Sequence, residues 1–233
     1  AVQARRGSSF RFFGNVAGEA ELNEAAMSAL AEAGLDDRAE VLAMQGKTDE
    51  ALADLGQAIK LEPKQPGILV KRARVFLARG ELVDADRDVS QSLQLRPRFA
   101  DALVVRAEVR VRTRKTDAAV ADCKEALAVH KRLATAHVIW ARALAHDSLD
   151  KAMRRCLRAL EVDKKSVDAH LLLAELSLAT GRDELLDDAE RHVSIAREQD
   201  QFAARALVHL AAIQVRRGRH KQAIHAAKKA LQL

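Results

Sequence analysis

The hydrophobic and polar positions of this chain follow a pattern that recurs about every 34 residues. The stretch 46–63, GKTDEALADLGQAIKLEP, returns as 80–97, GELVDADRDVSQSLQLRP, with glycine, alanine and proline at matching places. Within the repeated unit, apolar residues return every three or four positions, which is the spacing of one face of an α-helix. The pattern indicates a chain built from stacked copies of one structural unit.

Recurring alanines divide the chain into consecutive units. The spans are 32–65, 66–99, 100–133, 134–166, 167–203 and 204–233, each with two helical patterns and a turn between them. Small residues at fixed places allow two antiparallel helices to approach closely. Four of the turns contain a glycine, which accepts a positive φ: Gly46, Gly80, Gly181 and Gly218. Pro63 and Pro97 end the second helix of the first two units. We therefore predict an all-α solenoid.

Over residues 32–233 this pattern resembles the tetratricopeptide repeat (TPR), a 34-residue helix–turn–helix unit. The small residues at places 8, 20 and 27, the glycine near place 15 and the proline at place 32 match that family. Its tryptophan at place 4 and its tyrosine at place 11 do not match, since His137 and Leu42, for example, stand there. The resemblance implies a right-handed superhelical solenoid of about six TPR-like repeats, with a concave face formed by the first helix of each repeat.

Two repeats depart from the period. In the fourth, the spacing from Ala141 to Ala152 is one residue short, and the turn glycine is replaced around Ser148. In the fifth, the sequence RDELLDDAE lengthens the spacing between Gly181 and the next recurring alanine. We interpret the insertion as an extra first turn of the second helix, capped by Asp183 and favoured by acidic residues at its N-terminus. A functional loop is the alternative.

The N-terminal residues differ from the repeats in composition. Residues 1–18 form a basic, Phe- and Arg-rich arm without an acidic residue. This composition resembles an organellar transit sequence, of which the arm could be a remnant; a plain basic arm is the alternative. Residues 19–31 predict an acidic helix that caps the array. The sequence leaves the compartment unknown, whether cytoplasmic or organellar.

The resemblance places a set of side chains in the concave groove. Aliphatic residues stand at places 5 and 12 of the first helices, and charges of alternating sign stand at place 9. The groove candidates are Val70, Arg74, Leu77, Val104, Glu108, Val111, Val138, Arg142, Leu171, Glu175, Val208 and Val215. The aliphatic rows predict a groove for an apolar or helical segment of a partner protein. The alternating charges indicate either a ladder of ion pairs between repeats or a recognition surface.

Charge is separated along the chain. Residues 19–62 hold eleven acidic and three basic residues, a net charge of −8, whereas residues 201–233 hold seven basic residues and no acidic one. The basic end predicts a docking site made of Arg216, Arg217, Arg219, Lys221, Lys228 and Lys229. Three interpretations remain open. The ends could be two solvated faces, the basic end could dock on an acidic partner or on phosphate, or copies of the chain could associate head to tail.

Several functional classes find no support in the sequence. Catalytic motifs and metal-binding spacings are missing, so we expect no enzyme activity, no metal and no cofactor. Cys123 and Cys156 stand one period apart, which predicts two small core residues. The carboxylate clamp of chaperone-binding TPR proteins needs groove asparagines, and the only asparagines, Asn15 and Asn23, precede the array. No apolar run is long enough to be a transmembrane segment.

These observations predict a non-catalytic protein–protein interaction scaffold, or a subunit of a larger assembly, that binds its partner through the concave groove or the basic C-terminal repeat. The first alternative is an RNA-binding or RNA-processing factor that uses the basic end. Few aromatic residues are available in the array for stacking on bases, which weighs against it. The second alternative is a scaffold that assembles head to tail with other copies of itself.

Overall fold

The computed structural model describes residues 34–198 and 203–232. The predicted basic arm and acidic capping helix lie outside these residues. The described part contains twelve α-helices and no strand, so the all-α prediction is confirmed. The helices form six consecutive pairs: α2 (Leu35–Met44) with α3 (Thr48–Leu61), α4 (Pro66–Arg79) with α5 (Leu82–Leu95), α6 (Ala100–Arg112) with α7 (Thr116–Val129), α8 (Ala134–Leu144) with α9 (Leu149–Val162), α10 (Val167–Ala179) with α11 (Leu186–Arg197), and α12 (Ala203–Arg216) with α13 (His220–Ala230).

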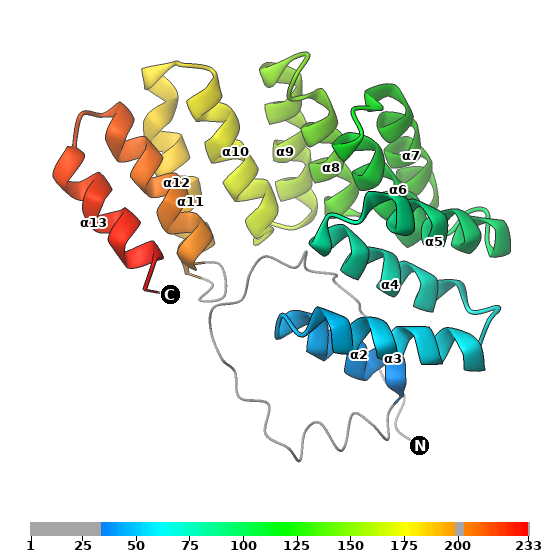
Figure 1. Ribbon diagram of the computed structural model, residues 1–233. Helices are drawn as coiled ribbons and strands as arrows, with labels where there is room; N and C mark the ends of the chain where they lie inside the picture. Colours follow the sequence, from blue (N-terminus) through cyan, green and yellow to red (C-terminus); the bar gives the residue numbers. More distant parts are fainter. Residues whose placement is uncertain (1–33, 199–202, 233) are drawn as a thin grey trace, which may run out of the picture.

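The six pairs follow one another along an arch, with α2 and α3 at one end and α12 and α13 at the other (Figure 1). Each helix packs against its partner in the pair, and each second helix packs against the first helix of the next pair. Successive first helices also contact one another, from α2 and α4 through to α10 and α12. The first helices therefore line the inner side of the arch, and the second helices lie toward its outer side.

The turns inside four of the helix pairs contain the glycines with positive φ that the sequence predicts. Gly46, Gly80, Gly181 and Gly218 all have a φ between 68° and 79°. In the third pair Arg114 takes the left-handed conformation instead, with a φ of 58°. In the fourth pair Ser148 caps α9, because its side-chain oxygen accepts a hydrogen bond from the backbone N–H of Lys151.

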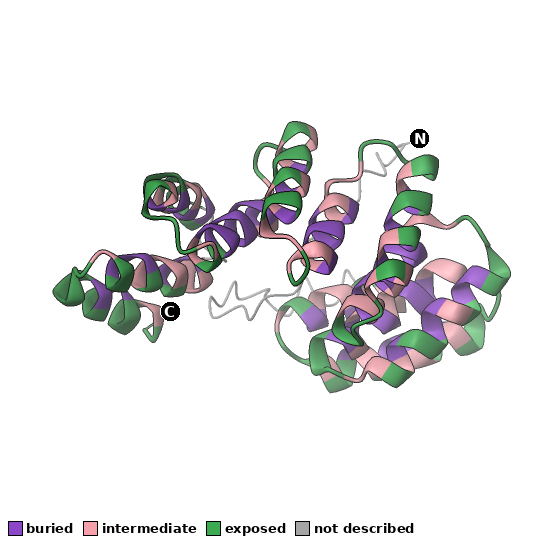
Figure 2. Cartoon of the chain, turned by 90° about the horizontal axis from the view of Figure 1, so that it is seen from above, coloured by how far each residue is buried: buried purple, intermediate pink, exposed green. Residues whose placement is uncertain are grey.

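Small residues bring the helices together. Most of the recurring alanines, such as Ala107 on α6 and Ala119 on α7, have no exposed surface, and buried residues face one another between the helices of each pair (Figure 2). Cys123 and Cys156 are free thiols in this core, as predicted. Burial raises the pKa of both thiols to about 12, so they stay protonated near neutral pH.

The insertion of the fifth repeat forms a 3-10 turn, Asp183–Leu185, directly before α11. The extra turn was predicted, but the role of Asp183 as its cap was wrong. Arg182 occupies the N-cap position, and no side chain caps the turn. The Asp183 carboxylate instead accepts a hydrogen bond from Arg216 of α12, at 3.1 Å. The insertion therefore joins the fifth helix pair to the sixth.

Candidate functional site

Most of the aliphatic residues predicted to line the groove are buried between helices. Val70, Val104, Val138 and Leu171, all at place 5 of a first helix, are at most 5% exposed, and Leu77 is 1% exposed. Val111 is half-buried. The first helix of the next pair covers these positions, because successive first helices pack against one another. The prediction of an apolar groove along the array is therefore wrong for these residues.

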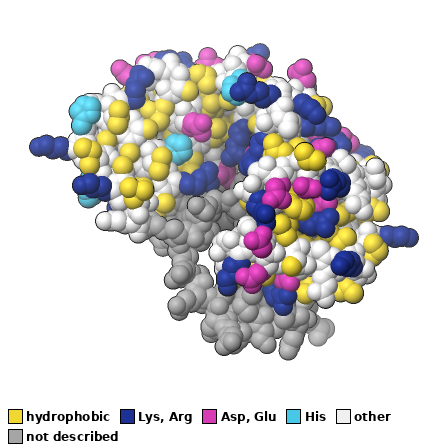
Figure 3. Space-filling view, viewed as in Figure 1, with side chains coloured by type: hydrophobic (Ala, Val, Ile, Leu, Met, Phe, Trp, Pro, Cys, Tyr) yellow, Lys and Arg dark blue, Asp and Glu magenta, His cyan; other side chains and the backbone are white. Residues whose placement is uncertain are grey.

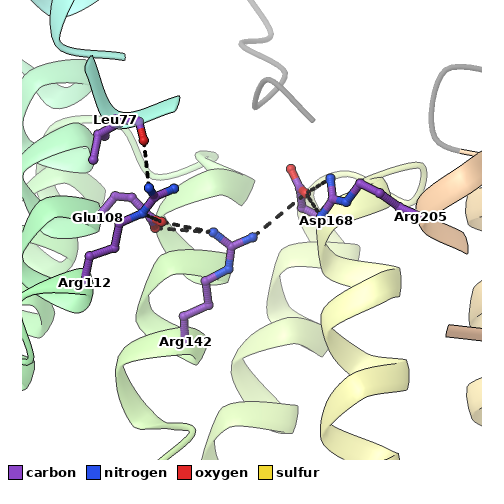
Figure 4. Close-up of polar contacts among 6 residues, drawn as sticks. All are labelled: Leu77, Glu108, Arg112, Arg142, Asp168 and Arg205. Atoms are coloured by element: carbon purple, nitrogen blue, oxygen red, sulfur yellow. Dashed lines mark hydrogen bonds and ion pairs between the residues drawn. The ribbon is translucent and has the colours of Figure 1, made fainter. Parts of the chain in front are cut away.

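The inner side of the arch carries a ladder of polar contacts that joins five consecutive first helices (Figure 4). Arg112 of α6 donates to the backbone oxygen of Leu77 of α4, at 2.7 Å, and pairs with Glu108 at 3.2 Å. Arg142 of α8 lies 3.3 Å from Glu108 and 4.0 Å from Asp168 of α10. Arg205 of α12 completes the series, 3.3 Å from the same Asp168 oxygen.

The ladder continues toward the N-terminal end of the described array. Lys71 of α4 donates to Asp36 of α2 at 2.7 Å, and Arg74 lies 4.0 Å from Asp101 of α6. Burial lowers the pKa of Arg74 to about 10, while Asp101 acts in the opposite direction, so the guanidinium stays charged near neutral pH. Figure 3 shows Lys and Arg side chains along the inner edge of the arch.

These contacts support the ladder hypothesis for the alternating charges at place 9. Glu108 and Arg142 pair directly, as a ladder requires. The charges at place 9 alone did not predict the partners at place 2, however. One of these, Asp168, forms ion pairs with both Arg142 and Arg205. Glu175, also at place 9, is exposed on α10.

A second recurrent ion pair fastens each of the first three helix pairs internally. Arg72 of α4 donates through Nε and Nη2 to the two carboxylate oxygens of Asp88 of α5, at 2.6 and 2.7 Å. The same bidentate contact joins Arg38 to Asp54 and Arg106 to Asp122. The signal was present in the sequence, since these arginines and aspartates recur every 34 residues.

The last described helix pair exposes the face that earlier pairs bury. Val208 of α12 is 59% exposed, whereas Val104, at the same place of the third pair, is 5% exposed. On α13, Ala227 is exposed, whereas Cys123 at the equivalent place of α7 is fully buried. The exposed apolar residues of this face are Val208 and Val215 on α12, Ile224 on α13 and Leu231 directly after it, and we refer to them as the terminal surface. Hydrophobic side chains lie beside Lys, Arg and His in this part of the molecule (Figure 3).

The six residues of the predicted basic end have two different roles. Arg216 donates to Asp183 and to the backbone oxygen of Gly181, and Arg217 pairs with Asp187 and, at 2.8 Å, with Glu190. These two arginines thus attach α12 to the fifth pair. The other four, Arg219, Lys221, Lys228 and Lys229, are exposed, and no ion pair joins them to other described residues.

Comparison with known proteins identifies the repeat. The family model described as "Tetratricopeptide repeat" matches residues 37–86, which include α3 and α4. The chain therefore contains tetratricopeptide repeat sequence. No curated protein sequence matches the chain.

Solved structures, two of them of TPR proteins, share the fold. A thermophilic TPR protein from Thermus thermophilus is 25% identical, with a TM-score of 0.71 over 78% of this chain and 97% of the relative. A TPR protein from Parabacteroides merdae is 20% identical, with a TM-score of 0.68 over 91% and 80%. PilW, a type IV pilus biogenesis factor, is 18% identical, with a TM-score of 0.66 over 88% and 91%.

The titratable side chains of this TPR array include one close histidine pair. His170 is buried and His192 is half-buried, with 2.8 Å between their Nδ1 atoms. Nε2 of His170 donates to the backbone oxygen of Lys164, which leaves its Nδ1 for the contact with His192. Burial lowers the pKa of His192, and His170 adds to this effect. The lowered pKa keeps His192 neutral near neutral pH, and the contact joins α10 to α11.

The described residues contain neither a candidate metal site nor a helix that could span a membrane. In this part of the chain no group of histidine, cysteine, aspartate or glutamate could hold a metal ion. None of the described helices has the length and apolarity to cross a bilayer.

Proposed function

We propose that this TPR protein is a non-catalytic interaction scaffold that binds an acidic, amphipathic helix of a partner protein on the terminal surface. The observation that carries the proposal is the exposure of Val208, Val215, Ile224 and Leu231 on a face that the other helix pairs bury. Each earlier pair uses this face to receive the first helix of the next pair. Its shape is therefore suited to a helix.

The charge around the terminal surface selects the kind of helix. Arg219, Lys221, Lys228 and Lys229 are exposed on α13 or directly before it, and α12 and α13 contain no acidic residue. A helix with an apolar stripe and flanking carboxylates would bury the four aliphatic side chains and neutralise the basic rim. Complementary charge of this kind chiefly raises the rate of association and sets specificity. The buried apolar stripe would supply most of the affinity.

The double variant Val208→Glu with Ile224→Glu tests the proposal in affinity purification with quantitative mass spectrometry. Both side chains are more than half exposed, so the changes leave the core intact. We expect partners of the unmodified protein to be lost, because glutamates on the terminal surface repel an acidic helix. Val83→Glu is the matched control, since Val83 is 73% exposed on α5, distant in the array.

Two outcomes would overturn this proposal. Partners retained by the double variant at the level of Val83→Glu would show that the terminal surface is not used. Partners lost equally from all variants would indicate a general effect of added negative charge. Loss of partners in the double variant alone, with an unchanged melting temperature, supports docking on the terminal surface.

A second copy of the chain is the second candidate for the occupant. The specific observation is the acidic first pair, where Asp37, Asp49 and Glu50 are exposed at the opposite end of the array from the terminal surface. Head-to-tail contact would bring these ends together. Sedimentation velocity at increasing concentration tests it. Self-association that the double variant abolishes would identify the occupant as a second copy, and a monomer at all concentrations would exclude it.

A further inference from the structure

The fourth helix pair replaces the recurrent arginine–aspartate pair with a different contact. Trp140 of α8 stands 34 residues after Arg106, and Arg155 of α9 stands 33 residues after Asp122, because the turn between α8 and α9 is one residue shorter. The Cζ atom of Arg155 lies 3.4 Å from the centroid of the Trp140 ring. The second helix thus contributes a cation at the position where the first three pairs contribute a carboxylate.

This exchange leaves the Arg155 guanidinium without a carboxylate. In the described residues Arg155 has no ion pair and no side-chain hydrogen bond, and its contact there is the stack on Trp140. A stacked guanidinium uses its flat face, so the N–H groups around its edge remain directed away from the ring. Arg72 in the second pair, by contrast, uses two of these N–H groups to hold Asp88.

Further basic groups surround the stack. The ammonium group of Lys124, on α7, lies 5.6 Å from the same ring centroid. His137 stands one turn before Trp140 on α8, and its buried Nδ1 has no hydrogen-bond partner among the described residues. Burial lowers the pKa of His137, and Arg155 and Arg158 lower it further.

The neighbouring acidic groups do not compensate this charge. Glu161 is bonded to Arg158 at 2.6 Å, and both side chains are well exposed. Burial lowers the pKa of Arg155, and repulsion from Arg158 adds to it. A bound anion would relieve both effects, since it would offset the repulsion among the cations and replace the lost solvation.

We infer that Arg155 and Lys124, which both lie against Trp140, form together with His137 a binding site for an oxyanion group on a peptide segment of a partner protein. The group is a carboxylate or a phosphoryl group, because both match the fork of a guanidinium. The two second helices α7 and α9 contribute the cations, so the site lies on the outer side of the array, apart from the ladder and from the terminal surface. The inference is therefore independent of the proposed function.

The site has a built-in reporter, because Trp140 is the only tryptophan of the chain. Indole fluorescence of the full chain would be followed during titration with three probes: inorganic phosphate, a glutamate-containing peptide and the same peptide with phosphoserine in place of glutamate. Isothermal titration calorimetry of the same mixtures gives a second measure of binding. We expect saturable binding of at least one of the two peptides, with a change in Trp140 emission.

Two variants separate the site from general charge attraction. Arg155→Gln should weaken peptide binding at least about tenfold, since it removes a charge-assisted bidentate contact. Arg154→Gln removes the same charge from an exposed residue of the same helix and should change the affinity by less than about twofold. Lys124→Gln changes an exposed residue and should weaken peptide binding by an intermediate factor. It therefore tests the site even if Arg155→Gln proves unstable.

The peptides distinguish the two sources of the oxyanion. Binding of the phosphoserine peptide alone assigns the site to phosphorylated partners, and comparable binding of both peptides assigns it to acidic segments in general. Binding of inorganic phosphate without either peptide would overturn the assignment to a protein partner. No saturable binding, or equal affinity of the Arg155→Gln and Arg154→Gln variants, would show that the stack is only a structural replacement for the ion pair.

Discussion

At the scale of single residues, the array depends on buried charges held in recurrent pairs. The Asp88 side chain is 2% exposed, and Arg72 satisfies both of its oxygens. Its equivalents in the first and third pairs, Asp54 and Asp122, are also buried. The recurrence of these residues every 34 positions is visible in the sequence. It does not predict their burial, because aspartate and arginine usually lie on the surface. The distance between the two helices of a pair decides that they are buried.

We predict that Arg72→Met lowers the free energy of unfolding by about 3–5 kcal/mol, because it leaves the Asp88 carboxylate buried without a partner. Arg87→Met is the control, since Arg87 pairs with Asp84 at the surface and is 68% exposed. That change should cost no more than about 1 kcal/mol. Urea unfolding followed by circular dichroism measures both. Equal losses in the two variants would contradict the importance of burial.

At the scale of the elements, the repeat period predicted the helix pairs well and the exposure of their side chains poorly. The same side of each first helix faces the inner side of the arch and the next first helix. A residue such as Val104 can therefore be either exposed or covered, and the period is the same in both cases. The curvature of the array brings successive first helices into contact and so decides whether such a residue is exposed. A pattern of residue types does not reveal this curvature.

The insertion of the fifth repeat shows a similar limit at the level of one turn. Its acidic residues predicted an extra turn, which the structure contains as Asp183–Leu185. Their partners, Arg216 and Arg217, however, lie at the end of α12 and directly after it, more than 25 residues later in the sequence. Local rules for helix capping therefore indicated the wrong role for Asp183. The contacts of Arg216 and Arg217 instead make this insertion the connection between the last two pairs.

We predict that Arg217→Gln loosens the last helix pair without affecting the first four. Arg217 is 15% exposed and pairs with both Asp187 and Glu190, so its loss should cost about 1 kcal/mol and speed amide exchange in α12 and α13 about fivefold. Repeat arrays transmit such changes mainly to adjacent repeats. Arg219→Gln, which breaks no ion pair between described residues, is the control. Equal exchange rates in the two variants would contradict this connection.

At the scale of the whole molecule, charge and apolar surface are arranged along the arch. The ladder from Lys71 to Arg205 connects the first helices of all six pairs on the inner side. Its charges largely satisfy one another, so the inner side has little unpaired charge to offer a partner. The exposed aliphatic residues of the terminal surface are accompanied on α12 and α13 by basic residues and by no acidic residue. This contrast is why we place partner binding at the end of the array.

Hydrogen–deuterium exchange of the full chain, alone and with a partner recovered by the unmodified protein, tests this placement most directly. Binding on the terminal surface predicts slower amide exchange in Ala203–Arg216 and His220–Ala230, with little change in the earlier pairs. The Val208→Glu and Ile224→Glu double variant should lose this protection. Protection confined to the inner side of α4, α6 and α8, with α12 and α13 unchanged, would contradict the account.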